Sequence, residues 1–244
     1  MVILLGRRFT IALSSFILDV MPPAIIVMAK VPLPGLAKTR LCPPLSLADA
    51  ASLAMCFVQD VVESALRVNP HVILAYTPAD GRAILEPVLP AGLQWLQQQG
   101  DDLDERLLAA IAYAYDRGFA PIIVLGTDSP TLPPALIEEA FKALSTGSAD
   151  VVLGPTVDGG YYLVGVRQPE PKIFHDISWS SPATFEQTAR NVRQLNLKLL
   201  TLEQWYDVDT FADLKSLHDE LLRHPIARER APQTYRWLNS HRDA

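Results

Sequence analysis

Apolar runs of strand length alternate with longer segments of helical periodicity along most of this 244-residue chain. The runs at residues 24–28 and 121–125 are strand-like, whereas residues 47–68 carry apolar side chains at helical spacing. Such alternation predicts an α/β fold, with a mostly parallel sheet covered by helices on both faces. Ligands of such sheets bind beyond the carboxyl ends of the strands. The segments that follow strands are therefore the places to look for a functional site.

The other predicted elements continue this alternation to about residue 222. Further strands are expected at residues 71–76, 93–97, 150–154, 161–166 and 198–202. Further helices are expected at residues 81–88, 104–117, 134–144, 181–195 and 211–222. Together they predict one catalytic domain over residues 21–222, followed by a polar, charged tail over residues 223–244 with one helical turn in it.

Residues 1–20 stand apart from this pattern. Arg7 and Arg8 precede an apolar stretch, which is typical of a weak signal peptide or a twin-arginine signal. However, no small-residue cleavage site follows, and the stretch is too short to span a bilayer. We expect an N-terminal extension outside the fold, with translation starting at Met21.

The composition favours an ordered domain with a large core. Hydrophobic residues make up 49% of the chain and charged residues 20%, which argues against disorder. The formal net charge of −6 argues against nucleic acid as a partner, because such binders carry a basic excess. Cys42 and Cys56 show neither metal-ligand spacing nor a disulfide pattern, so reduced thiols in a cytoplasmic protein are expected.

A basic loop follows the first predicted strand, at residues 29–41. It carries Lys30, Gly35, Lys38 and Arg40, and it contains no acidic residue. Backbone N–H groups at a helix start, together with the charges of Lys and Arg, can hold phosphate. An ordinary solvated connection between a strand and a helix is the alternative, and the loop alone does not distinguish the two.

Acidic residues follow two later strands. Asp128 comes after the apolar strand 121–125, and Asp207 and Asp209 precede the helix predicted at 211–222. Hard cations such as Mg²⁺ and Mn²⁺ take carboxylate oxygens, so Asp128 and Asp209 together could flank one such ion. In an extended segment Asp207 and Asp209 point the same way. Asp128 and Asp209 could instead cap the turn or helix that follows each of them.

Two further segments combine glycine with polar side chains. Asp158 precedes Gly159 and Gly160, a pattern that suits either a tight turn between strands or the close approach of a ligand. Asp158 is also the candidate general base. Gln99 and Gly100 follow a predicted strand, where amide groups could contact a nucleotide base.

Three common kinds of catalytic site are missing from the sequence. The chain has no Gly-x-Gly-x-x-Gly fingerprint, no Walker lysine pattern and no Ser-His-Asp order with a nucleophile elbow. Nicotinamide chemistry, P-loop chemistry and serine hydrolysis are therefore disfavoured.

Six motifs in a fixed order carry a resemblance to a known family. They lie at residues 29–41, 99–107, 126–130, 158–162, 179–180 and 207–210. Over about residues 23–218 the chain resembles the radical-SAM/selenodomain-associated transferase 1 family, also described as arsenosugar-biosynthesis glycosyltransferases. That family is similar to the phospholactate and molybdenum-cofactor guanylyltransferases.

The resemblance implies a three-layer α/β/α architecture with a mostly parallel mixed sheet, the nucleotide-diphospho-sugar transferase or glycosyltransferase-A fold. It implies that donor phosphates are held by Lys30, Gly35, Lys38 and Arg40. It implies that Mg²⁺ or Mn²⁺ is bound by Asp128 and Asp209. Contacts with the base are implied for Gln99 and Gly100, and contacts with the acceptor or its phosphate for Asp158.

The predicted activity is metal-dependent transfer of a glycosyl group from a nucleotide-activated sugar to a small-molecule acceptor. Lys38, Arg40 and Asp158 are the predicted catalytic residues. Guanylyltransferase-like nucleotidyl transfer from a nucleoside triphosphate is the alternative, and a nucleotide-binding regulatory module without catalysis is a third hypothesis. The sequence leaves open the base, the sugar, the acceptor and the oligomeric state, a homodimer included. Neither nucleic acid nor a membrane is expected as a partner.

Overall fold

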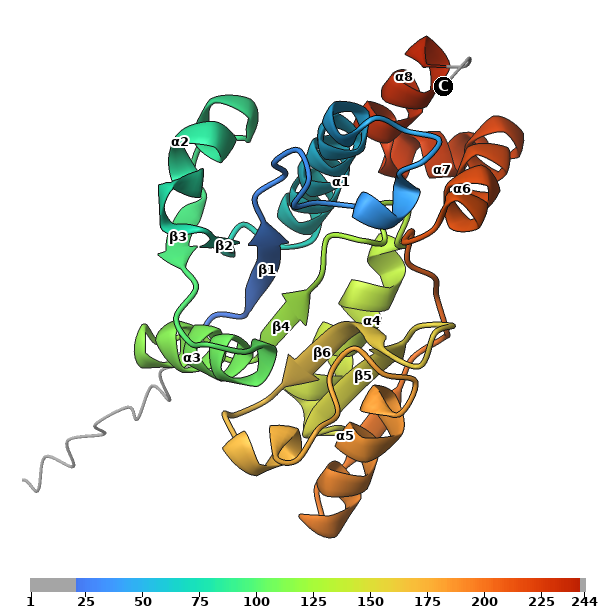
Figure 1. The fold of residues 1–244 in the computed structure, drawn as a ribbon. Helices are drawn as coiled ribbons and strands as arrows, with labels where there is room; N and C mark the ends of the chain where they lie inside the picture. The colour runs from blue at the N-terminus through green and yellow to red at the C-terminus, as the bar shows by residue number, and fades with distance from the viewer. Residues whose placement is uncertain (1–20, 242–244) are drawn as a thin grey trace, which may run out of the picture.

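A computed structural model describes residues 21–241, and within them seven strands form one sheet between two layers of helices (Figure 1). The strand order is β3-β2-β1-β4-β6-β5-β7. Strand β6 is antiparallel to both of its neighbours, and the other neighbouring pairs are parallel. The predicted three-layer α/β fold with a mostly parallel mixed sheet is therefore confirmed. The N-terminal extension predicted at 1–20 lies outside the described residues.

The strands closely match the predicted ones. They are β1 Ala24–Lys30, β2 Val72–Thr77, β3 Gln94–Gln97, β4 Ile122–Leu125, β5 Val151–Pro155, β6 Tyr161–Val166 and β7 Leu199–Thr201. The main helices are α1 Leu47–Val68, α3 Leu103–Asp116, α4 Pro134–Thr146, α5 Thr184–Gln194 and α6 Phe211–Arg223.

The helix predicted at 81–88 is divided into three short pieces, η2 Ala79–Gly81, α2 Arg82–Leu85 and η3 Glu86–Val88. Pro87 explains part of this division, because proline has no N–H to continue an α-helical hydrogen-bond ladder. Two further 3₁₀ turns, η1 Thr39–Leu41 and η4 Pro171–Phe174, lie in loops.

Both faces of the sheet are buried. In β1, Ile25 and Val27 pack in a cluster with side chains of α1 and α4, whereas Ile26 packs in a second cluster with side chains of α3 and α5. Alternate residues of a strand point to opposite faces, so a strand covered on both sides is apolar throughout. This explains why the apolar runs in the sequence are continuous.

The carboxyl ends of the parallel strands meet at one edge of the sheet. The basic loop after β1, the loop after β4, the turn after β5 and the segment after β7 all leave the sheet there. The fold thereby gathers the predicted site segments where such sheets bind their ligands.

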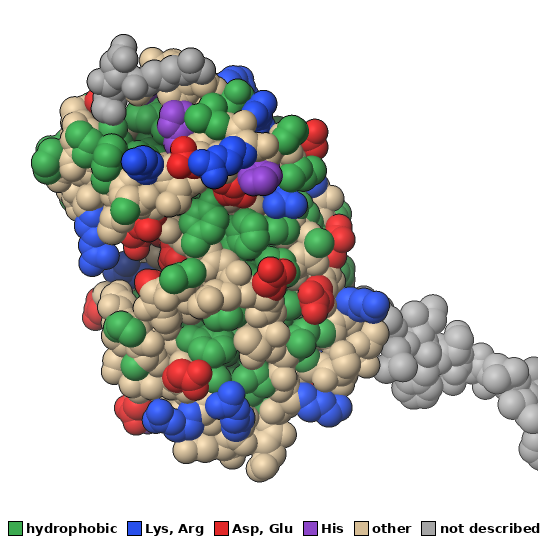
Figure 2. Space-filling view, turned by 90° about the vertical axis from the view of Figure 1, so that its right-hand side faces the viewer, with side chains coloured by type: hydrophobic (Ala, Val, Ile, Leu, Met, Phe, Trp, Pro, Cys, Tyr) green, Lys and Arg blue, Asp and Glu red, His purple; other side chains and the backbone are tan. Residues whose placement is uncertain are grey.

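The predicted tail is instead part of the folded domain. Helices α7 Pro225–Arg230 and α8 Pro232–Ser240 follow α6, and Trp237 and Leu238 pack with Leu53 of α1 in a third apolar cluster. The prediction was wrong because few apolar residues are spread among many charges in this part of the chain. Figure 2 shows Lys, Arg and His side chains gathered at this upper end of the molecule.

Helix α8 obtains its N-terminal cap from α1. Its N-cap residue, Ala231, has no side chain that can accept a hydrogen bond, but the buried Asp60 accepts from the backbone N–H groups of Gln233 and Thr234, both at 2.9 Å. The Thr234 hydroxyl also donates to Asp60 at 2.6 Å. Among the described residues, no helix is long and apolar enough to cross a membrane.

Asp60 makes the stability of the protein depend on pH. Burial raises the pKa of Asp60 from 3.8 to about 6, against the hydrogen bonds that lower it. Between these values the unfolded chain loses a proton that the native state keeps. The free energy of unfolding, relative to that of Asp60→Asn, is therefore expected to fall by about 2 kcal/mol as pH rises from 4 to 6. Urea unfolding of both proteins at several pH values measures this, and a constant difference would contradict it.

Candidate active site

A pocket of about 560 Å³ lies at the carboxyl edge of the sheet. Its walls come from the basic loop, α1, the start of α3, and the loops after β4, β5 and β7. The predicted site residues in its lining are Lys30, Lys38, Arg40, Asp128, Asp158 and Asp209. The fold thus brings Lys30 and Asp209, which are 179 positions apart in the sequence, to the same pocket.

Three other predicted residues do not line this pocket: Gly35, Gln99 and Gly100. The Gln99 side chain donates to the backbone oxygen of Gln97 at 3.3 Å. Gly100 has φ +123°, and a Cβ atom there would lie 2.5 Å from Cβ of Glu105. Gly100 is thus required for the close approach to α3, and the base contacts of Gln99 and Gly100 remain predictions.

Lys38 lies at the centre of the polar groups. It precedes η1 and has a left-handed backbone, with φ 48°. Its Nζ atom is 2.7 Å from Oδ1 of Asp128 and 2.8 Å from Oδ1 of Asp209, and only 8% of its side chain is exposed. Burial by itself lowers the pKa of Lys38, but the two aspartates outweigh it and the pKa is raised. The two acids predicted to share a metal ion therefore share a lysine ammonium group.

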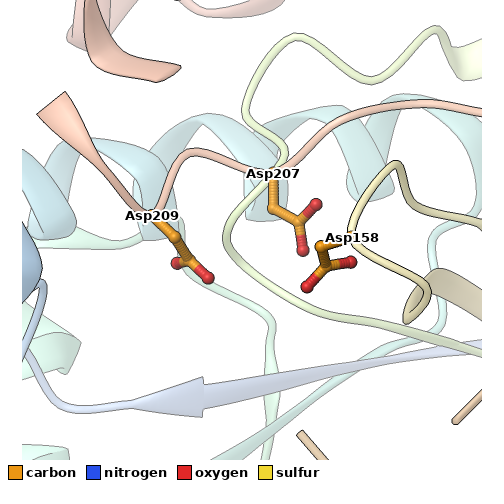
Figure 3. A group of neighbouring side chains, drawn as sticks. All are labelled: Asp158, Asp207 and Asp209. Carbon is orange, nitrogen blue, oxygen red and sulfur yellow. The ribbon is translucent and has the colours of Figure 1, made fainter. Parts of the chain in front are cut away.

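Asp209 also belongs to a cluster of three carboxylates. The carboxylates of Asp158, Asp207 and Asp209 place one oxygen each within 4.8 Å of one another, and Figure 3 shows them turned toward the same space. Burial, followed by repulsion from Asp158, Asp209 and Asp128, raises the pKa of Asp207 to about 7, although Lys38 opposes this. We call Asp158, Asp207 and Asp209 the acidic trio.

The donor atoms of the acidic trio fit a hard divalent cation. Three carboxylates supply oxygen ligands, and their mutual repulsion is what an ion of charge +2 relieves. The side chain of Asp209 is not used to cap α6, because Thr210 and Asp213 form the capping box of that helix. The alternative of Asp209 as a helix cap is thereby excluded. Asp128 lies outside the trio, and its metal role remains a prediction.

Asp158 is held by a turn that packs on another loop. Its Oδ1 atom accepts from the Thr156 hydroxyl at 2.5 Å and from the Gly160 N–H at 3.0 Å. Gly159 has φ +92°, and a Cβ atom there would lie 2.3 Å from the carbonyl oxygen of Pro182. The tight turn is thus present and Asp158 lines the pocket, whereas the close approach of a ligand at the glycines remains a prediction.

Two side chains of the site were not among the predicted site residues. Asp207 joins Asp209 because alternate residues of an extended segment point the same way, a signal that the sequence does contain. Ser180 lines the pocket with φ 55°, a conformation that is uncommon for serine. Its only sequence signal is its place in the Trp-Ser motif.

Comparison with known proteins identifies the family. A model of DUF2064, described as an uncharacterized protein conserved in bacteria, matches residues 61–181. The crystal structure of a candidate nucleotide-diphospho-sugar transferase from Desulfovibrio desulfuricans is 32% identical, with a TM-score of 0.83 over 90% of this chain and 95% of that one. This chain belongs to the DUF2064 family. No curated protein matches its sequence.

Two more distant structures share the fold of this DUF2064 protein. A CMP:2-keto-3-deoxy-manno-octonic acid synthetase complexed with CTP is 16% identical, with a TM-score of 0.54 over 82% of this chain and 99% of that one. A cytidylyltransferase from Leptospira borgpetersenii is 13% identical, with a TM-score of 0.53 over 91% and 95%. Together with the closer relative they confirm the predicted nucleotide-diphospho-sugar transferase fold, and the protein is a transferase.

The geometry distinguishes the two acids that the sequence paired. Asp209→Asn removes one of three clustered carboxylates, so we expect Mn²⁺ binding to weaken by at least about tenfold. Asp128→Asn removes only an ion-pair partner of Lys38, so its effect is expected to be within about threefold. Electron paramagnetic resonance of free Mn²⁺ measures both. A larger loss in Asp128→Asn would place the ion at Asp128 instead of at the acidic trio.

Proposed function

We propose that this protein is a metal-dependent glycosyltransferase that uses a nucleotide-activated sugar and a small-molecule acceptor. The observation that carries the proposal is one pocket lined both by the basic loop and by Asp158 and Asp209 of the acidic trio. A nucleoside diphosphate needs both features, because cationic side chains and a divalent ion share its negative charge. The 32% identical relative, named for nucleotide-diphospho-sugar transfer, supports the same choice.

Each polar group then has a role. Lys30, Lys38 and Arg40 contact the donor phosphates, where fixed positive charge stabilises the leaving diphosphate as the glycosyl bond breaks. The acidic trio holds Mg²⁺ or Mn²⁺, which supplies further charge neutralisation at that phosphate when bound. We assign Asp158 to the metal in preference to proton removal, because its carboxylate lies within 4.8 Å of those of Asp207 and Asp209.

Nucleotidyl transfer is the second candidate. The likeness to a CTP-bound synthetase and to a cytidylyltransferase favours it, because both share this fold. The two reactions differ in what leaves: a glycosyltransferase releases a nucleoside diphosphate or monophosphate, whereas a nucleotidyltransferase releases pyrophosphate. We further propose that the protein belongs to the selenodomain-associated subfamily and is located in the cytoplasm. If it transfers a nucleotidyl group, we expect it to use a guanine nucleotide.

A panel of nucleotides and nucleotide-sugars tests the proposal. A ligand that binds only the native state raises the melting temperature in proportion to its occupancy. We expect at least one nucleotide-sugar to raise it in the presence of Mn²⁺, with a smaller shift when the metal is chelated. Product analysis with that donor then separates the two candidates. A panel with no shift from any nucleotide contradicts both of them.

Lys38 provides a second test, because its ammonium group occupies the space between Asp128 and Asp209. Lys38→Met is expected to bind Mn²⁺ alone roughly tenfold more tightly, equivalent to about 1.4 kcal/mol. The same variant is expected to bind a nucleoside diphosphate more weakly. Calorimetric titration measures both affinities.

Lys30→Met is the matched control for Lys38→Met. Lys30 lines the same pocket, but within residues 21–241 it has no carboxylate at ion-pair distance. It should therefore lose nucleotide affinity without the gain in Mn²⁺ affinity. An equal gain in both variants would mean that the loss of any positive charge near the site raises the metal affinity, and that the ion pairs of Lys38 are not the cause.

A further inference from the structure

The segment that carries two members of the acidic trio is bonded to the loop after β4. The N–H of Val208 donates to the backbone oxygen of Asp128 at 2.9 Å. The hydroxyl of Ser129 donates to the backbone oxygen of Tyr206, also at 2.9 Å. Val208 is fully buried in the apolar cluster that α6 shares with α1. These contacts hold the backbone on either side of Asp207.

The side chain of Tyr206 enters a polar network that the proposed reaction does not use. Its hydroxyl is hydrogen-bonded to the carboxylate of Glu220 in α6 and lies 3.0 Å from the hydroxyl of Thr131. The Thr131 hydroxyl donates to the same carboxylate oxygen of Glu220 at 3.1 Å, and Thr131 is fully buried. Two hydroxyl groups from two different loops thus converge on one carboxylate.

Glu220 has no counter-ion. Within residues 21–241 no Lys, Arg or His lies at ion-pair distance from it, although its side chain is partly buried. Its carboxylate is instead satisfied by the hydroxyl groups of Thr131 and Tyr206. The two hydrogen bonds therefore connect Tyr206 and the loop after β4 to α6.

We propose that Glu220 is a positioning residue for the metal site and acts through Tyr206. This inference rests on the proposed function. In an extended segment Tyr206 and Val208 point to one side and Asp207 and Asp209 to the other, so anchoring the first pair orients the second. Without an anchor, three like-charged carboxylates repel one another and move apart.

Helix α6 supplies the frame for this positioning. Thr210 caps the helix immediately after Asp209, and Glu220 lies near its other end. We call residues 206–209 the acidic segment. It is attached to α6 at the helix cap and again through the Tyr206 hydroxyl. A charge-assisted hydrogen bond to Glu220 restricts Tyr206 more strongly than a neutral partner would.

The test compares Mn²⁺ binding by the full-length protein and its variants. Tyr206→Phe removes only the hydroxyl, and Glu220→Ala removes its partner. Both are expected to weaken Mn²⁺ binding by roughly tenfold, the lower end of what loss of an outer-sphere partner causes. Glu220→Gln retains an acceptor for the hydroxyl and should restore most of the affinity. Binding of a nucleoside diphosphate without metal should be unchanged in all three.

Tyr161→Phe is the matched control, because it removes another buried tyrosine hydroxyl, from a side chain that packs against the cluster of α3 and α5 and not against α6. Melting temperatures of all variants monitor folding. Wild-type Mn²⁺ affinity in both Tyr206→Phe and Glu220→Ala overturns the inference, as does an equal loss in Tyr161→Phe. Absence of Mn²⁺ binding by the wild-type protein overturns the proposed metal dependence instead.

Discussion

The ion pairs of Lys38 with Asp128 and Asp209 hold together three of the segments that line the pocket. One segment leaves β1, one leaves β4 and one precedes α6, so a single ammonium group joins the middle of the sheet to the C-terminal part of the domain. Burying a lysine is costly unless opposite charges surround it, and here two aspartates do so. The arrangement also brings positive and negative charge to the same point, as phosphate and metal recognition together require.

The reversed direction of β6 explains how the third acid reaches this point. Strand β6 runs antiparallel to β5, so the connection between them is a tight turn at the carboxyl end of β5. A parallel neighbour would need a crossover that carries the chain to the opposite edge. Asp158 occupies the turn, and Gly159 allows the turn to pack against Pro182 in the loop before α5. The one antiparallel strand in the described sheet is therefore a condition for the acidic trio.

Helix α1 connects the basic loop to the C-terminal helices. It follows the loop, packs on the sheet with one face, and with another joins the apolar cluster formed by α6 to α8. Asp60, in the middle of α1, supplies the cap that α8 lacks. Helix α6 in turn begins at Phe211, with Thr210 as its N-cap directly after Asp209, and it carries Glu220. Packing in this third cluster and the geometry of the acidic segment are thus linked through α6.

The sequence by itself determined the alternation of elements, the parallel character of the sheet and the basic loop with acids after later strands. These follow from local periodicity and from the common edge at which parallel strands end. Only the tertiary structure decided that Lys38 lies between Asp128 and Asp209, that Asp207 and Asp158 join Asp209, and that residues 225–240 fold as helices. These features depend on tertiary packing, which a local sequence pattern does not predict. Packing sets the side-chain distances between remote loops, and it brings Asp60 to the N-terminus of α8, where it caps Gln233 from 173 positions away.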